Sequence, residues 1–338
     1  MAFDANKKDL TVAVIGTGTM GRGIVQVSAA GGMKVIAYDE KPGGAAAATL
    51  DRLGITAADV LYALNPKTGQ IYALATVPTF DPNKPAEAVQ ADIGNRALSQ
   101  VFEPGSTSKV MTLAAVIEQH RATPLTKLVI PPVLVRPGKT FHDHDKHGTE
   151  HLTLNGVLAK SSNIGTILAA ERIGGQVLYS YLKKFGVGSP TGLQFPGESQ
   201  GYVPDPEHWS ATSFGTIAFG QGLSMNAVQA ASIYATIAND GVRVSPTLIS
   251  GYTAADGRFQ AAAPAASRRV VSVATARTMR MMLESVVSDE GTAPMAAIPG
   301  YRVAGKTGTA DRANPDPHGS RYKGFTSSFI GMAPADNP

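Results

Sequence analysis

Three short motifs, far apart in the chain, constrain it most strongly, because together they form a serine acyl-transfer signature. In chain order they are Ser106-Thr107-Ser108-Lys109, Ser161-Ser162-Asn163 and Lys306-Thr307-Gly308. A serine hydroxyl is a weak nucleophile until a base lies beside it. A single Ser-x-x-Lys arises easily by chance and commonly marks only a helix N-cap. The whole set, in this order and context, makes coincidence a poor explanation.

The first motif predicts a nucleophile and its base one helical turn apart. Ser106 and Lys109 are separated by three positions, so they share a face if a helix begins here. An apolar run over residues 110–117 continues as a buried helix. Burial and neighbouring cations lower the pKa of a lysine, so that Lys109 can accept the proton of Ser106.

The second motif lies between two helical patterns and supplies polar groups. The hydroxyl of Ser161 can pass a proton to a leaving group. The amide of Asn163 can hydrogen-bond both a substrate and Lys109.

The third motif lies on a strand pattern near the end of the chain. Lys306 and Thr307 can bind a substrate carboxylate, and Gly308 leaves room for the substrate backbone. The strand N–H just past it, at Thr309, can complete an oxyanion hole with the N–H of Ser106.

The remaining pattern indicates an α+β fold. Two strand patterns, 60–64 and 70–75, flank Asn65-Pro66-Lys67-Thr68-Gly69, which predicts a hairpin turn. This second Lys-Thr-Gly is therefore assigned no catalytic role. Helical patterns dominate from 106 to about 280, and strand patterns return at 301–309 and 325–333. Strands at both ends with helices between suggest one domain that closes its sheet late.

An unrelated signature precedes these motifs. The dinucleotide fingerprint Gly16-x-Gly18-x-x-Gly21 follows a predicted strand at 11–15 and leads into a predicted helix at 20–30. A second strand is predicted at 34–38 and ends at Asp39, and a short helix is predicted at 45–53. In such a fingerprint Gly16 allows a tight turn, Gly18 lets the backbone approach a pyrophosphate, and Gly21 permits close helix–strand packing. Asp39 is spaced to bind a ribose hydroxyl. The chain supplies barely one of the two βαβ halves that a dinucleotide needs, so NAD binding is disfavoured.

Composition excludes several function classes. The 338 residues carry a net charge of +4 with no Lys/Arg block, which argues against nucleic-acid binding. The absence of cysteine excludes disulfides, a thiol nucleophile and cysteine-ligated metals. A metal site is conceivable where four histidines and two aspartates cluster, but the polar segment favours a solvated loop; these residues are His142, Asp143, His144, Asp145, His147 and His151. No secretory signal or membrane span is predicted.

Residues 58–338 resemble the transpeptidase domain of class B penicillin-binding proteins, particularly the cell-division branch. The supporting stretches are the three motifs with their flanks, 65–75, 102–109, 219–224 and 303–310. The resemblance implies an antiparallel sheet flanked by helices. It also implies that Ser106 attacks the penultimate D-Ala carbonyl of a peptidoglycan stem peptide and is acylated by β-lactams, with no metal or organic cofactor. Members work at the cell envelope, outside the cytoplasmic membrane, with the division machinery as a partner.

Residues 9–53 resemble the start of the 3-hydroxyacyl-CoA dehydrogenase family, which implies a Rossmann-like fragment. We therefore expect two parts, 1–56 and 57–338. In the penicillin-binding family a further strand, central in the sheet, and a C-terminal helix follow the point where this chain stops. We expect a chimeric or truncated arrangement in which the strand at 11–15 takes that vacant position beside 325–333.

Three alternatives stay open. A truncated, non-catalytic penicillin-binding scaffold would keep the motifs without turnover. A β-lactamase uses the same motifs but adds a deacylating glutamate, and its Glu-x-x-Leu-Asn string is absent from the sequence. An NAD-dependent 3-hydroxyacyl-CoA dehydrogenase fragment comes last.

Overall fold

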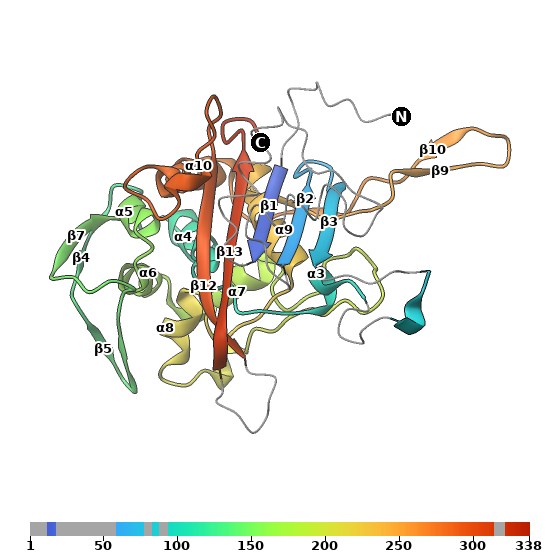
Figure 1. Cartoon of the computed structure of the whole chain (residues 1–338). Coiled ribbons are helices and arrows are strands. Elements are labelled where there is room, and N and C mark those ends of the chain that lie inside the picture. The colour runs from blue at the N-terminus through green and yellow to red at the C-terminus, as the bar shows by residue number, and fades with distance from the viewer. Residues whose placement is uncertain (1–11, 18–58, 78–82, 88–93, 314–321) are drawn as a thin grey trace.

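The structure is a computed structural model that describes residues 12–17, 59–77, 83–87, 94–313 and 322–338. Its centre is a five-stranded antiparallel sheet in the order β12-β13-β1-β2-β3, and the five strands lie side by side in Figure 1. The strands are β1 (Val12–Thr17), β2 (Asp59–Leu64), β3 (Ile71–Val77), β12 (Ala304–Ala313) and β13 (Tyr322–Ala333). The predicted α+β class with an antiparallel sheet is confirmed.

A tight turn joins β2 to β3, as the sequence predicts. The Asn65 side chain accepts hydrogen bonds from the backbone N–H groups of Lys67 (2.9 Å) and Thr68 (3.1 Å). Gly69 follows with a φ of +75°, which glycine adopts at little cost. The asparagine and the glycine therefore fix the register of this hairpin.

The strand β1 occupies the middle of the sheet. It pairs with β13 from Val12 opposite Ala333 to Thr17 opposite Ser328, and it meets β2 where Ile15 lies opposite Tyr62. The expected pairing of the first strand pattern with 325–333 is therefore confirmed. Gly16 lies inside β1, opposite Phe329.

Strand pairing continues through Gly16, the first glycine of the predicted dinucleotide fingerprint, and the role of that fingerprint stays a prediction. The remaining predicted elements of the first segment lie outside the described residues. They are the helix at 20–30, the strand at 34–38, the helix at 45–53 and the residues Gly18, Gly21 and Asp39.

Three helices contribute many of the core residues beside the sheet. In α4 (Lys109–Glu118) eight successive residues from the first are buried, and α9 (Ala227–Ala238) is buried along its whole length. A capping box between Asn226 and Gln229 begins α9, which lies against β1, β2 and β13. The third helix, α10 (Val273–Val287), lies against β12 (Figure 1).

The described residues form five further helices, which complete the body of the protein. They are α3 (Arg96–Ser99), α5 (Leu154–Ala159), α6 (Asn163–Ala170), α7 (Gly174–Phe185) and α8 (Ser213–Ala218), with the single 3-10 turns η1 (Pro85–Glu87), η3 (Gly105–Ser108), η4 (Pro206–His208) and η5 (Pro294–Ala296). Of these helices, α6 and α7 lie against α4, whereas α3 lies against α9, β2 and β3. No helix in the described part of the chain is long and apolar enough to span a membrane.

The prediction of helices from 106 to 280 is incomplete, because four two-stranded sheets interrupt them. They pair β4 (Lys127–Ile130) with β7 (Glu150–Thr153), β5 (Leu134–Arg136) with β6 (Lys139–Phe141), β8 (Val242–Val244) with β11 (Ser267–Arg269), and β9 (Gly251–Thr253) with β10 (Phe259–Ala261). Strands of three or four residues are too short for an alternating pattern to show in the sequence. The β9–β10 hairpin projects from the body of the protein (Figure 1).

Candidate active site

The predicted nucleophile lies at the entrance to α4. Ser106 is half-buried in the turn η3, and the backbone N–H of Lys109 donates to the carbonyl oxygen of Ser106. In a 3-10 turn the side chains at positions i and i+3 eclipse each other. The turn therefore presents Ser106 and Lys109 on one side, as the three-residue spacing predicts.

The side chain of Lys109 is completely buried and joins the first motif to the second. Its Nζ lies 2.8 Å from Asn163 Oδ1, 3.1 Å from Ser161 Oγ and 2.5 Å from the Ser161 carbonyl oxygen. Burial holds the pKa of Lys109 well below its ordinary value, and the positive charge of Lys306 lowers it further. The carboxylate of Asp143 opposes both effects.

The second motif has a conformation that the surrounding structure must maintain. Ser161 has a φ of +61°, a region that L-residues rarely adopt and that costs about 1–3 kcal/mol. Ser162 caps α6, since its hydroxyl accepts from the N–H of Gly165 at 2.8 Å. This sharp entry into α6 turns Ser161 and Asn163 toward Lys109.

The third motif lies on β12, in the pairing with β13. Lys306 is completely buried, and burial lowers its pKa to about 7. Its Nζ donates to the Thr307 carbonyl oxygen (3.1 Å) and lies 3.3 Å from Thr307 Oγ1. Thr307 is half-buried and Thr309 is exposed, so β12 carries accessible polar groups next to the buried side chain of Lys306.

Two glycines bring the first and third motifs together. A Cβ atom on Gly308 would lie 2.8 Å from the Pro104 carbonyl oxygen, and one on Gly105 would lie 2.5 Å from the Thr309 carbonyl oxygen. Gly105 also has a φ of +52°. The turn that carries Ser106 therefore rests directly on β12, and neither position has room for a side chain.

The described residues thus bring together the predicted site residues of all three motifs. The fingerprint residues are not part of this arrangement: Gly16 lies in β1, and its predicted partners lie outside the described residues. The other Lys-Thr-Gly, at 67–69, lies in the β2–β3 turn. We find no group of three or more metal-ligating side chains in the parts of the chain that the structure describes.

Sequence reasoning missed two residues at this site. Asp143, considered only as part of a solvated histidine loop, accepts a hydrogen bond from Ser162 Oγ at 2.7 Å. Thr292, in the segment after α10, lies with its Oγ1 2.8 Å from Thr307 Oγ1. The contacts join residues that are 19 and 15 positions apart in the sequence, and no local sequence pattern predicts them.

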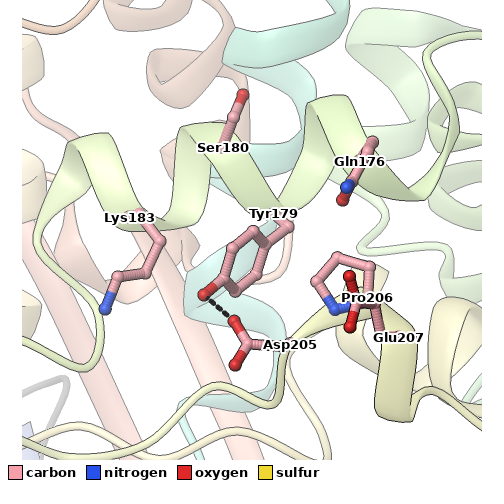
Figure 2. Close-up of a pocket in the computed structure, with 7 residues that line it drawn as sticks. All are labelled: Gln176, Tyr179, Ser180, Lys183, Asp205, Pro206 and Glu207. Atoms are coloured by element: carbon pink, nitrogen blue, oxygen red, sulfur yellow. Dashed lines mark hydrogen bonds between the residues drawn. The ribbon is translucent and has the colours of Figure 1, made fainter.

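A separate cleft of about 700 Å³ lies between α7 and η4 (Figure 2). Its lining consists of Gln176, Tyr179, Ser180, Lys183, Asp205, Pro206 and Glu207. Figure 2 shows the hydroxyl of Tyr179 donating to Asp205 across it. None of the three motifs contributes a residue to this cleft.

Comparison with known families agrees with the geometry. The model of the penicillin binding protein transpeptidase domain matches residues 60–338. A model of the 3-hydroxyacyl-CoA dehydrogenase NAD binding domain matches residues 11–68, most of which lie outside the described residues.

Individual proteins extend this result. The chain is 43% identical over 284 residues to penicillin-binding protein PbpB of Mycolicibacterium smegmatis, covering 81% of this chain and 44% of that protein. It is 34% identical over 271 residues to peptidoglycan D,D-transpeptidase FtsI of Escherichia coli K12, covering 80% of this chain and 44% of that protein. The chain therefore spans less than half the length of these relatives.

A solved structure gives the same fold. Penicillin binding protein 3 from Mycobacterium tuberculosis, in complex with aztreonam, superposes with a TM-score of 0.73 at 37% identity, over 82% of this chain and 68% of that one. The sheet, the three motifs and these likenesses agree, and the chain belongs to the family of penicillin-binding protein transpeptidase domains.

Proposed function

We propose that this protein is a serine D,D-transpeptidase that cross-links peptidoglycan stem peptides and is acylated covalently by β-lactams. The observation that carries the proposal is the position of Lys109. It follows Ser106 by one turn, is fully buried, and places Nζ against both Ser161 Oγ and Asn163 Oδ1. The names of the relatives, penicillin-binding protein and peptidoglycan D,D-transpeptidase, support the same chemistry.

The acylation step uses Lys109 as the base. Ser106 Oγ attacks the carbonyl carbon of the penultimate D-Ala, while the Ser106 proton passes to Lys109 Nζ in its neutral form. The lowered pKa of Lys109 increases the neutral fraction at physiological pH. The N–H groups of Ser106 and Thr309 would stabilise the oxyanion of the tetrahedral intermediate.

Collapse of this intermediate breaks the peptide bond and forms the ester. The leaving D-Ala nitrogen takes a proton from Lys109 through the Ser161 hydroxyl, which lies 3.1 Å from Nζ. An amine of a neighbouring stem peptide then attacks the ester carbonyl and loses a proton to Lys109; the bond to Ser106 Oγ breaks, and Lys109 returns that proton to Oγ. In a β-lactam the ring opens and the leaving nitrogen stays tethered, so the ester persists.

The third motif would hold the substrate. Lys306 and Thr307 are placed to bind the carboxylate of the terminal D-Ala or of the β-lactam, since Lys306 Nζ and Thr307 Oγ1 lie within 3.3 Å of each other. Burial lowers the pKa of Lys306 to about 7, and a bound carboxylate would favour its protonated form. The reaction needs no metal and no NAD.

Three further assignments belong to this proposal. The substrate places the reaction at the cell envelope, and the resemblance to the cell-division branch suggests the division machinery as partner. The chain divides at about residue 56, since the transpeptidase match begins at 60. The central position of β1 nevertheless makes residues 12–17 part of the sheet.

The test is release of D-Ala from a peptide ending in D-Ala-D-Ala, with and without an amine acceptor. We expect D-Ala release and an acceptor adduct with the parent protein and neither with Ser106→Ala. A folded parent that is acylated by penicillin but releases no D-Ala would instead indicate a penicillin-binding scaffold without turnover.

A further inference from the structure

A loop outside the three motifs is fastened to the second one. The loop connects β6 to β7 and contributes Asp143, whose side chain is 10% exposed. One carboxylate oxygen accepts from Ser162 Oγ (2.7 Å) and lies 3.1 Å from His147 Nε2; the other accepts from the backbone N–H of Ile164 (2.9 Å). The carboxylate thus contacts both sides of Asn163.

The same loop also fixes the orientation of Asn163. Its Nδ2 donates to the carbonyl oxygen of His142 at 3.2 Å, which leaves Oδ1 directed at Lys109 Nζ. An amide turned the other way would present two N–H groups to a lysine.

His147 contacts the same carboxylate oxygen of Asp143 that accepts from Ser162. Its Nδ1 contacts the Gly148 carbonyl oxygen and its Nε2 contacts the carboxylate, and both of these partners are acceptors only. A neutral imidazole can donate from only one nitrogen, so the arrangement suits the charged form. These hydrogen bonds, together with the charges of Asp143 and Glu150, raise the pKa of His147 despite its partial burial.

We propose that Asp143 is a positioning residue for acylation: it holds the strained Ser161–Asn163 segment so that both side chains meet Lys109. The proposal rests on the function proposed above. Charged hydrogen bonds to a mostly buried carboxylate are strong enough to maintain a residue at a φ of +61°. The negative charge of Asp143 has a second effect, since it raises the pKa of Lys109 and so opposes the effect of Lys306.

The pH dependence of acylation distinguishes the positioning effect of Asp143 from the effect of its charge on the pKa of Lys109. Asp143→Asn keeps the shape of the side chain and one acceptor oxygen but removes the charge. The pKa of Lys109 should then fall, so the acidic limb of the acylation rate should move to lower pH. Asp143→Ala removes the contacts as well, and we expect its maximal rate to fall about 10- to 100-fold. A residue with only a structural role would lower the maximum without moving the limb.

The experiment measures the second-order rate of acylation of the whole chain by a fluorescent penicillin between pH 5.5 and 10. The matched control is Asp145→Asn, in the same loop at an exposed position. We expect this control to follow the parent. Circular dichroism checks each variant for folding, and Asp143→Asn carries the test if Asp143→Ala does not fold.

The outcomes distinguish the two proposals. A parent that is acylated, with Asp143→Asn and Asp143→Ala unchanged in rate and in pH profile, would overturn the role of Asp143 and leave the transpeptidase site intact. A lowered maximum with an unmoved limb in Asp143→Asn would also overturn it as stated. A folded parent that is never acylated would overturn the proposed function, and the role of Asp143 with it.

Discussion

The tripeptide Lys-Thr-Gly occurs at 67–69 and again at 306–308, and the structure gives the two copies opposite surroundings. Lys67 is exposed in the β2–β3 turn, where its Nζ lies 3.4 Å from Asn337 Oδ1. Lys306 is completely buried on β12, beside the turn that carries Ser106. The two glycines also differ. Gly69 has a φ of +75°, whereas Gly308 lies so close to the Pro104 carbonyl oxygen that a side chain would not fit.

This contrast shows that the tripeptide has no chemistry of its own. On β12 burial lowers the pKa of Lys306 to about 7 and Thr307 supplies a hydroxyl within 3.3 Å. In the turn, Thr68 instead accepts from the backbone N–H of Gln70 at 3.2 Å and so stabilises the hairpin. Variants made in pairs, one at each copy, test whether the surroundings account for the difference.

The largest expected difference is in the lysines. Lys306→Ala removes the proposed carboxylate contact, a charged hydrogen bond, and we expect the rate of acylation by benzylpenicillin to fall by roughly 100-fold or more. Lys67→Ala should leave the rate unchanged. Stopped-flow or quenched-flow acylation measures both. Equal rates for the two variants would remove the third motif from the site.

The second-largest difference should be between alanine substitutions at the two glycines. In Gly308→Ala the new methyl group would meet the Pro104 carbonyl oxygen at 2.8 Å and displace the turn that carries Ser106, so we expect acylation to fall about 10- to 100-fold. Gly69→Ala should cost about 1–3 kcal/mol of stability, because of its positive φ and the Ser245 carbonyl oxygen, with little change in acylation. Thermal unfolding and acylation together separate these effects; a matching loss of acylation in both variants would contradict the account.

The buried lysine should also appear in the pH dependence of stability. The pKa of Lys306 is about 7 in the folded protein against 10.5 for an ordinary lysine, so the unfolded chain binds more protons between these values. The free energy of unfolding should therefore rise with pH over this window, by up to about 1.4 kcal/mol per pH unit from this group. Burial of Lys109 acts in the same direction.

Lys306→Met isolates that contribution. It should reduce the rise and increase stability at pH 7, although it impairs acylation, while Lys67→Met should keep the parent's slope. Urea unfolding at pH 7, 8.5 and 10 measures the slopes. Parallel slopes in the parent and Lys306→Met would show that Lys306 titrates as an exposed lysine does.

The smallest difference should come from the threonine partners. Thr292→Val removes the hydroxyl that lies 2.8 Å from Thr307 Oγ1, and we expect a two- to fivefold loss of acylation, from about 0.5–1 kcal/mol for one neutral hydrogen bond. Thr68→Val should affect only the hairpin. A Thr292→Val variant with the parent's rate would remove Thr292 from the site.

The sequence predicted those parts of the fold and site that depend on local patterns. The hairpin turn at Asn65, the helix after Ser106 and the strands near 301–309 and 325–333 each have a signal within a few residues. The pairing of β1 with β13 followed from a family comparison, since a strand is missing at one end and present at the other. The four short sheets were not predicted because strands of three or four residues are too short to show an alternating pattern.

The site escaped prediction wherever it depends on contacts between distant segments. Nothing near Asp143 indicates that its carboxylate reaches the N-terminus of α6, because about 20 residues separate them in the chain. The position of Gly16 within β1 illustrates a related limit of local patterns. A glycine fingerprint is a local pattern, but whether the strand before it ends there depends on its partner, and β13 continues beside Gly16.

The most direct test of the acyl-transfer site is the intact mass of the protein after incubation with benzylpenicillin, followed by peptide mapping. The account predicts one penicilloyl group per chain, attached to Ser106 in the parent and in Lys67→Ala and absent from Ser106→Ala. A folded parent with no added mass, or an adduct that survives in Ser106→Ala, would contradict it.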